Sequence, residues 1–188
     1  MLRTARSSST RGLSRAVLLT RWRTHAMTEK IFRVLFLCPD NSMRSLMAEA
    51  YLNARGPGHL RAFSAGIVPA AVPHHEVLEV LQRGGISADR LSPKSAREIL
   101  QNGHSFDLVF ALLNDTEDAT ALRAIIPFTA VWTIPSADAP AANRGARGQV
   151  EETFALLRKR IDYLRHLSLR QLENLTLLAK PLSTPGHP

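Results

Sequence analysis

Cysteine is nearly absent from the sequence: Cys38 is the single one among 188 residues. One thiol excludes an internal disulfide and any metal site built from several cysteines, and it suits a reducing compartment, so we expect a cytoplasmic protein. Long apolar runs are also missing. None reaches the roughly 18 to 20 residues needed to cross a bilayer, which predicts no membrane span. Aromatic residues are sparse at 6%, but a hydrophobic fraction of 45% is ordinary for a globular chain.

Acidic residues are absent from the first part of the chain. Residues 1–26 contain six arginines, no lysine and no acid, and without them the formal net charge falls from +8 to +2. The rest of the chain is therefore nearly neutral, which argues against a nucleic-acid-binding face and a nucleic-acid partner. The arginine-rich segment has the composition of a mitochondrial transit peptide, of a disordered basic arm, or of sequence upstream of a start at Met27. Each interpretation places it outside the fold.

Short β-prone runs alternate with helical patterns along residues 27–178. Strands are expected at 32–37, 60–64, 106–112 and 129–132, and helices at 45–53, 73–84, 96–100, 149–167 and 169–179. Such alternation favours parallel pairing through helical crossovers. The sequence therefore predicts an α/β three-layer sandwich, with a four-stranded parallel sheet and helices on both faces. Residues 1–26 are expected to form a basic extension and residues 179–188 a flexible C-terminal tail.

A cysteine and an arginine flank the turn from the first expected strand into the first helix. Cys38 ends the strand, and Arg44 follows six positions later at the first turn of the helix. A loop between them can point successive backbone N–H groups inward as a nest for an anion, and the helix N-terminus adds about half a positive charge. The guanidinium of Arg44 can close over two oxygens in a fork. The sequence therefore predicts an oxyanion-binding loop.

The same positive field should act on the thiol of Cys38. A free thiol has a pKa near about 8.5, and lowering it by about two units needs roughly 2.7 kcal/mol of selective stabilisation of the anion. We expect the loop, the helix end, Arg44 and the hydroxyl of Ser45 to supply it together. The prediction is a depressed pKa and a thiolate placed beneath a bound tetrahedral oxyanion, ready for attack on phosphorus.

This segment resembles the phosphate loop of the low-molecular-weight protein tyrosine phosphatase superfamily, in which Cys-x5-Arg-Ser follows the first strand. The likeness continues at Phe63-Ser64-Ala65-Gly66, at Lys94-Ser95 and at Phe106–Val109, and it covers nearly all of residues 27–178. The last long helix looks closer to the bacterial arsenate-reductase-like branch. Lys94 itself is expected at the surface.

The resemblance implies a phosphatase acting on a phosphotyrosine-like phosphomonoester, with no cofactor and no metal. Cys38 would be the nucleophile. The phosphate would be bound by the loop residues Pro39, Asp40, Asn41, Ser42, Met43, Arg44 and Ser45.

Two loop positions depart from the family pattern. Asp40 stands where the family usually has glycine, and Met43 where it often has cysteine. Asp tolerates a left-handed backbone, so the loop geometry can survive. If its charge faced inward, at about 6 Å and an effective dielectric constant of about 20, it would cost about 3 kcal/mol per unit of ligand charge.

The arsenate-reductase branch passes its oxidation to a second cysteine after the third strand. Aligned without gaps, that position is Leu113 here, so an internal disulfide relay is impossible. An arsenate reductase built on this chain would need an external thiol, such as glutathione or a thioredoxin-like protein.

The general acid of the family is an Asp-Pro that ends the loop after the fourth strand. Without a gap, Ser136 takes that place, and Asp138 lies two residues further on. Asp138 is the candidate acid if the loop is shifted. Three hypotheses stay open: a phosphatase, an arsenate reductase using an external thiol, and a catalytically weakened oxyanion-binding or regulatory domain.

Overall fold

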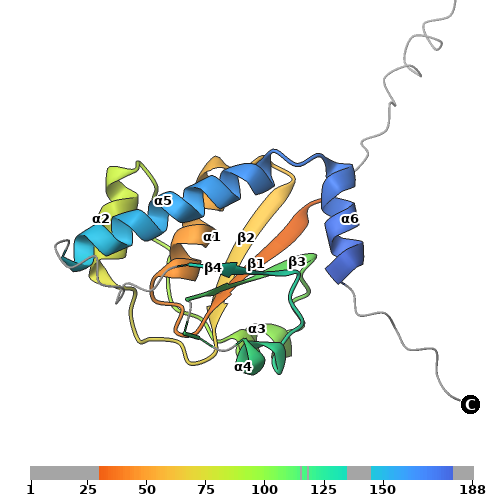
Figure 1. The fold of residues 1–188 in the computed structure, drawn as a ribbon, viewed down its shortest axis with the longest axis horizontal. Helices are drawn as coiled ribbons and strands as arrows, with labels where there is room; N and C mark the ends of the chain where they lie inside the picture. Colours follow the sequence, from red (N-terminus) through yellow and green to blue (C-terminus); the bar gives the residue numbers. More distant parts are fainter. Residues whose placement is uncertain (1–29, 115, 118, 135–144, 180–188) are drawn as a thin grey trace, which may run out of the picture. The chain divides into compact units, whose positions relative to one another are not determined.

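The computed structural model describes residues 30–114, 116–117, 119–134 and 145–179. Its strands are β1 (Phe32–Cys38), β2 (Leu60–Gly66), β3 (Leu108–Leu113) and β4 (Ala130–Thr133). Its helices are α1 (Arg44–Arg55), α2 (His75–Arg83), α3 (Ala96–Gln101), α4 (Thr120–Arg123), α5 (Ala146–Arg165) and α6 (Leu169–Ala179) (Figure 1). Within this part of the chain, no helix is both long enough and apolar enough to cross a membrane.

The four strands form one parallel sheet in the order β2-β1-β3-β4. β1 pairs with β2 along its whole length, from Phe32 opposite Leu60 to Cys38 opposite Gly66. On its other side β1 pairs with β3, and β3 pairs with β4. From β1 the chain continues to β2 on one side of it, and from β3, on the other side of β1, it continues outward to β4. The connections that leave β1 and β3 therefore run in opposite directions from the carboxyl ends of these strands. In open α/β sheets such a switch point is where ligands bind.

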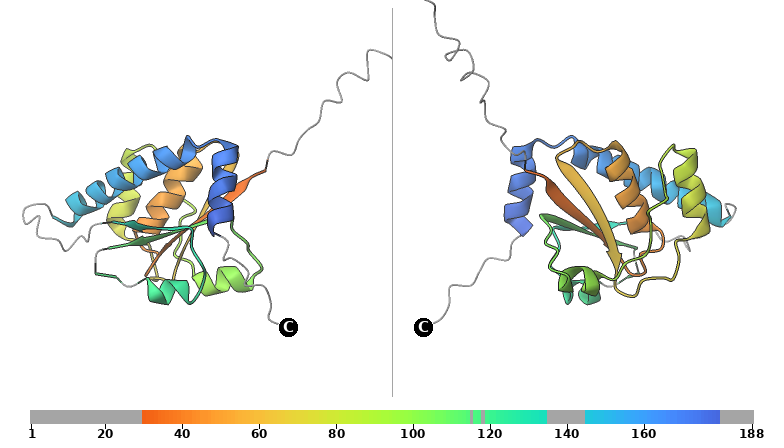
Figure 2. Two further views of the ribbon diagram at one scale, coloured as in Figure 1. Left: turned by 45° about the vertical axis from the view of Figure 1, so that its right-hand side comes forward. Right: turned by 180° about the vertical axis from the view of Figure 1, so that it is seen from behind.

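Alternate residues of β1 point to opposite faces of the sheet and belong to two separate hydrophobic cores. Val34 and Phe36 of β1 belong to one buried cluster, together with residues of α1, α2 and α5. Leu35 and Leu37 belong to the other, with Ala96 of α3 and Leu122 of α4. Figures 1 and 2 show α1, α2 and α5 over one face of the sheet and α3 and α4 over the other. The predicted three-layer α/β sandwich is confirmed.

The predicted elements are present, with shifted ends and one addition. The stripe of Phe154, Leu157, Ile161 and Leu164 is buried as expected, although α5 begins at Ala146 and ends at Arg165. β3 begins two residues later than predicted. Asp107 meets β1 through its backbone and its side chain: its N–H donates to the Arg33 carbonyl at 2.9 Å, and its carboxylate accepts from the Arg33 N–H at 2.8 Å. The short helix α4 was not predicted, because a single turn is too short to show a helical period.

Candidate active site

The loop between β1 and α1 is bound on its outer side by the segment that follows β2. The carbonyl of Pro39 accepts from the N–H groups of Ile67 and Val68, the carbonyl of Asp40 from Ala70, and the carbonyl of Ser42 from His74. In a trans peptide the N–H points opposite to the carbonyl. Because these carbonyls face outward, the N–H groups of residues 40, 41 and 43 are directed into the loop, which is the arrangement of an anion nest.

Asn41 fixes the bend of this loop from inside. It is fully buried and has a left-handed backbone, with φ of 49°, a conformation that Asn tolerates better than most residues. The side-chain Nδ2 of Asn41 donates to Ser45 Oγ at 2.7 Å. Its side-chain Oδ1 accepts from the backbone N–H of Lys94 at 2.7 Å. The loop is therefore tied to α1 and to the segment before α3.

Cys38 lies at the floor of the loop with its side chain fully buried. Its Sγ is 2.9 Å from Ser45 Oγ and donates to Asp40 Oδ1 at 3.6 Å. Since Ser45 Oγ already accepts from Asn41, its own hydroxyl hydrogen is free to donate to the sulfur. The resulting chain of donors runs from Asn41 through Ser45 and Cys38 to Asp40.

The electrostatics of Cys38 differ from the sequence-based expectation. Burial raises the pKa of the Cys38 thiol, and the nearby charge of Asp40 acts in the same direction. Hydrogen bonds from Ser45 and the charge of Arg44 lower it, but burial outweighs them. The prediction of a depressed pKa is wrong for the free protein, because the sulfur lies wholly away from water and beside a carboxylate.

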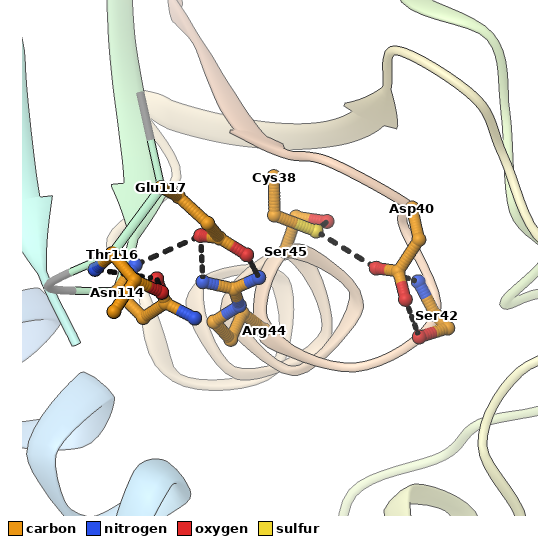
Figure 3. A network of polar contacts seen from close by, with 8 residues as sticks. All are labelled: Cys38, Asp40, Ser42, Arg44, Ser45, Asn114, Thr116 and Glu117. Atoms are coloured by element: carbon orange, nitrogen blue, oxygen red, sulfur yellow. Dashed lines mark hydrogen bonds and ion pairs between the residues drawn. The ribbon is translucent and has the colours of Figure 1, made fainter. Parts of the chain in front are cut away.

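Arg44 does not stand alone at the start of α1. Its two terminal nitrogens donate to the two carboxylate oxygens of Glu117 at 2.6 and 2.8 Å, in a partly buried, bidentate pair (Figure 3). Glu117 also accepts from the Asn114 N–H at 2.8 Å. Against the effect of burial, these bonds hold the pKa of Glu117 below its ordinary value. The two terminal nitrogens of Arg44, which the sequence predicts to bind an oxyanion, are thus hydrogen-bonded to a protein carboxylate.

Asp40 is exposed, but one oxygen of its carboxylate, Oδ1, is directed at Cys38 Sγ. Its Oδ1 accepts from the Ser42 N–H at 3.2 Å, and its Oδ2 accepts from the Ser42 hydroxyl at 2.6 Å. Figure 3 shows the carboxylate pointing from the far side of the loop back toward Cys38. Two carboxylates therefore act on the guanidinium of Arg44: Glu117 binds it directly, and the charge of Asp40 acts on it without a hydrogen bond. Met43 is partly buried and packs against the core, so it is a structural part of the loop.

A second polar cluster supports the loop from behind. Lys94 Nζ donates to Glu49 Oε2 at 3.0 Å, and the same oxygen accepts from the buried Ser64 hydroxyl. The lysine side chain is 30% exposed and paired with Glu49, so Lys94 is partly exposed, as expected, and also binds a partner. Its backbone binds Asn41 while its ammonium group binds Glu49, which joins α1, β2 and the loop.

Sequence reasoning missed Glu117, Glu49 and the role of Ser64. Glu117 is 73 positions from Arg44 and reaches it because β3 lies beside β1, so that both strands end at the same edge. The one available signal was its place just after a strand of the predicted sheet. Asp138 and Ser136, the two candidates for the acid position, lie outside the described residues. Among the residues that the structure does describe, no group of three His, Cys, Asp or Glu side chains could hold a metal ion.

Comparison with known proteins gives a consistent result. The sequence model of the family described as low molecular weight phosphotyrosine protein phosphatase matches residues 33–134. An arsenate reductase from Archaeoglobus fulgidus is 26% identical with a TM-score of 0.57, covering 71% of this chain and 99% of that one. A low molecular weight protein tyrosine phosphatase from T. tengcongensis is 27% identical with a TM-score of 0.53, covering 71% and 97%.

A more distant likeness concerns the fold alone. A thioredoxin-dependent arsenate reductase from Corynebacterium glutamicum is 21% identical with a TM-score of 0.53, covering 85% of this chain and 68% of that one. No curated protein matches the chain.

Proposed function

Because the chain belongs to the low molecular weight phosphotyrosine protein phosphatase family, we propose that it hydrolyses a phosphomonoester of the phosphotyrosine kind, with Cys38 as nucleophile. The observation that carries the proposal is the convergence of Cys38, the inward N–H groups of the loop and Arg44 at the carboxyl end of β1. A tetrahedral oxyanion in this loop would lie above the sulfur, within reach of the backbone donors and of the remaining N–H groups of Arg44.

The reaction has to begin with removal of the thiol proton, because burial keeps Cys38 protonated. We infer that this proton passes to an oxygen of the entering phosphate dianion, and the Ser45 hydroxyl at 2.9 Å then stabilises the thiolate. The sulfur attacks phosphorus, the S–P bond forms and the ester P–O bond breaks. Asp138 serves as the acid that protonates the leaving oxygen.

In the second step water attacks the phosphocysteine. The Asp138 carboxylate takes the proton of the water, the S–P bond breaks, and Cys38 recovers its own proton from the departing phosphate. Protons and charge balance over the cycle. The roles of the loop residues 39–45 and of Arg44 are the same in both steps: they hold three phosphoryl oxygens while the fourth position changes.

The proposal is tested with an aryl phosphate and two proteins. The natural chain should release the aryl alcohol, and the Cys38→Ser variant should release none, because a serine hydroxyl is a far weaker nucleophile here. A burst followed by slow turnover would show a working Cys38 without an effective acid. Equal release by both proteins would contradict Cys38 as nucleophile.

A second candidate, arsenate reduction with an external thiol, is favoured by the single cysteine and by the similarity to the Archaeoglobus fulgidus arsenate reductase. Cys38 would form an S–As bond with arsenate as water leaves. An external thiol would then attack the Cys38 sulfur, and the electron pair of the S–As bond would leave with arsenic as arsenite. A second thiol would reduce the resulting mixed disulfide. Arsenite production that needs added glutathione or thioredoxin would support this candidate.

The third hypothesis, a weakened oxyanion-binding or regulatory domain, is favoured by the Glu117 carboxylate bound to Arg44 and by the charge of Asp40 nearby. Its signature would be phosphate bound with no burst and no turnover. That outcome would contradict both enzymatic proposals.

A further inference from the structure

The loop contains a fixed hydrogen-bond acceptor beside the sulfur. Asp40 is exposed at the mouth of the loop, yet its carboxylate is held by Ser42 from two directions, through the backbone N–H and the hydroxyl. Its carbonyl is bound separately by the N–H of Ala70. These contacts leave Oδ1 directed at Cys38 Sγ, 3.6 Å away (Figure 3). An oxyanion bound directly above the sulfur would therefore lie near this oxygen.

The Asp40 carboxylate is ionised in the free protein at neutral pH. Although burial opposes it, the hydrogen bonds from Ser42 and the charge of Arg44 hold the pKa of Asp40 below its ordinary value. An ionised carboxylate accepts hydrogen bonds and donates none. Arg44 is bound bidentately to Glu117, so the described structure gives Asp40 no direct ion pair that would neutralise its charge toward the ligand.

An acceptor in this place discriminates between oxyanions. A ligand oxygen that carries a hydrogen can donate it to Oδ1, but a bare oxygen meets a like charge with nothing between them. Near neutral pH inorganic phosphate and arsenate retain at least one O–H group, whereas sulfate, which is also tetrahedral, has none. In the free protein the Cys38 thiol is the donor to Oδ1.

We propose that Asp40 makes this loop selective for oxyanions that carry an O–H group, which donates to Asp40 Oδ1 in place of the Cys38 thiol. The inference rests on the proposed function and narrows its ligand class to protonated phosphate or arsenate groups. Sulfate and other oxyanions without a hydrogen should bind more weakly than phosphate or arsenate. A phosphomonoester dianion meets this requirement once one of its oxygens has accepted the Cys38 proton. The same proton is then hydrogen-bonded to Asp40 Oδ1 both before binding, from the sulfur, and after binding, from the phosphate oxygen.

The test is the ratio of the dissociation constants of inorganic sulfate and inorganic phosphate, measured by calorimetry near pH 7 on the full chain. We expect the natural protein to bind phosphate more tightly than sulfate by a factor on the order of 10². The factor should be smaller than the discrimination of a fully buried hydrogen-bonding site, because Asp40 is exposed. In Asp40→Asn the ratio should fall to within about threefold of unity, because the amide can donate to a bare oxygen. Asp40→Gly should give the same result and guards against an effect peculiar to asparagine.

Glu117→Gln is the matched control. It also removes one negative charge near Arg44, but Glu117 makes no hydrogen bond to Cys38 in the described structure. It should change both affinities by a similar factor and leave their ratio within about threefold of the natural one. A ratio near unity in the natural protein, or one that Asp40→Asn leaves unchanged, would overturn the selectivity while the oxyanion loop stands. Failure of every variant to bind either anion would overturn the oxyanion loop of the proposed function and the selectivity with it.

Discussion

At the scale of single residues, the site is governed by how the charges around Cys38 are paired. Arg44 is bound by Glu117 and acted on by the charge of Asp40, and the sulfur is buried beside Asp40. The free protein therefore stores its nucleophile as a protonated thiol, and ligand binding has to change that protonation state. Three predictions follow from individual side chains.

Cys38 should make the protein less stable in mild alkali. Burial raises the pKa of its thiol, whereas an exposed thiol in the unfolded chain loses its proton near about pH 8.5. Above that pH the unfolded state holds fewer protons than the folded state, so the free energy of unfolding falls by up to about 1.4 kcal/mol per pH unit. Thermal midpoints between pH 7.5 and 10 should decline less in Cys38→Ala. Superimposable profiles would show that the thiol is not held protonated.

Glu117→Gln should destabilise the protein at neutral pH by about 1 to 3 kcal/mol, since it breaks a partly buried ionic pair. The pKa of Glu117 is lowered in the folded state, so the stabilisation is present above about pH 4.5 and is lost as the pH falls through the folded-state value. The difference between the natural chain and the variant in urea unfolding should therefore shrink below pH 4.

The matched control for that variant is Glu151→Gln. Glu151 also binds an arginine, Arg83, at 2.6 Å, but both side chains are nearly half exposed. Such surface pairs contribute about 0 to 1 kcal/mol. A loss as large in Glu151→Gln as in Glu117→Gln would contradict the importance of the site pair.

Asp138→Asn should lower the turnover of aryl esters with poor leaving groups by roughly 10² to 10⁴ if Asp138 is the acid, because the leaving oxygen then departs unprotonated. Esters with good leaving groups should be affected less. If Ser136 holds the acid position, Ser136→Asp should raise the rate and Asp138→Asn should change little. No change in either variant would favour the oxyanion-binding domain over an enzyme.

At the scale of elements, the loop between β1 and α1 owes its shape to the segment after β2. The end of β2 approaches it closely: a Cβ added to Gly66 would lie 2.8 Å from the backbone nitrogen of Asn41 and 2.9 Å from the carbonyl carbon of Asp40. Backbone atoms cannot yield as a flexible side chain can. The strand end and the loop are therefore built as one unit.

Gly66→Ala should destabilise the protein by about 1 to 3 kcal/mol and weaken phosphate binding, because the added methyl group displaces the loop backbone. Gly58→Ala is the control, since a Cβ there meets nothing within 4 Å. Unfolding in urea and phosphate titration of both variants check the prediction. Normal phosphate affinity in Gly66→Ala would show that the loop tolerates the displacement.

At the scale of the whole molecule, two segments differ sharply in composition. Residues 1–26 carry six arginines and no acid, and they lie outside the described residues. The domain boundaries at 26 and 178 stay predictions. Among the residues that the structure describes, the first member of the two cores is Phe32.

A chain that starts at Met27 should keep the thermal midpoint of the full chain within measurement error. The removed residues show no sustained apolar period with which to pack against the domain. Differential scanning calorimetry of the two chains in one buffer is the measurement. A clear drop in the midpoint would show that the basic segment contributes to folding.

The fold class and the position of the loop are predictable from the amino-acid sequence alone. The short, nearly continuous apolar runs 32–37 and 106–112 indicate buried strands, and the helical stripe through Phe154 and Ile161 indicates a packed helix, because both patterns depend on local backbone geometry. The Cys38 to Arg44 spacing likewise placed the nucleophile and the cation on either side of one turn. These are properties of neighbours along the chain.

The charge state of the site depends on contacts between distant parts of the chain. Glu117 reaches Arg44 from another strand, Lys94 reaches Glu49 from a loop, and the burial that raises the pKa of Cys38 comes from elements packed around it. Whether Asp40 Oδ1 is directed at Cys38 Sγ likewise depends on the bonds from Ser42 and from the segment after β2. Burial and ion pairing between distant residues depend on how the elements pack, and no local pattern in the sequence records that packing.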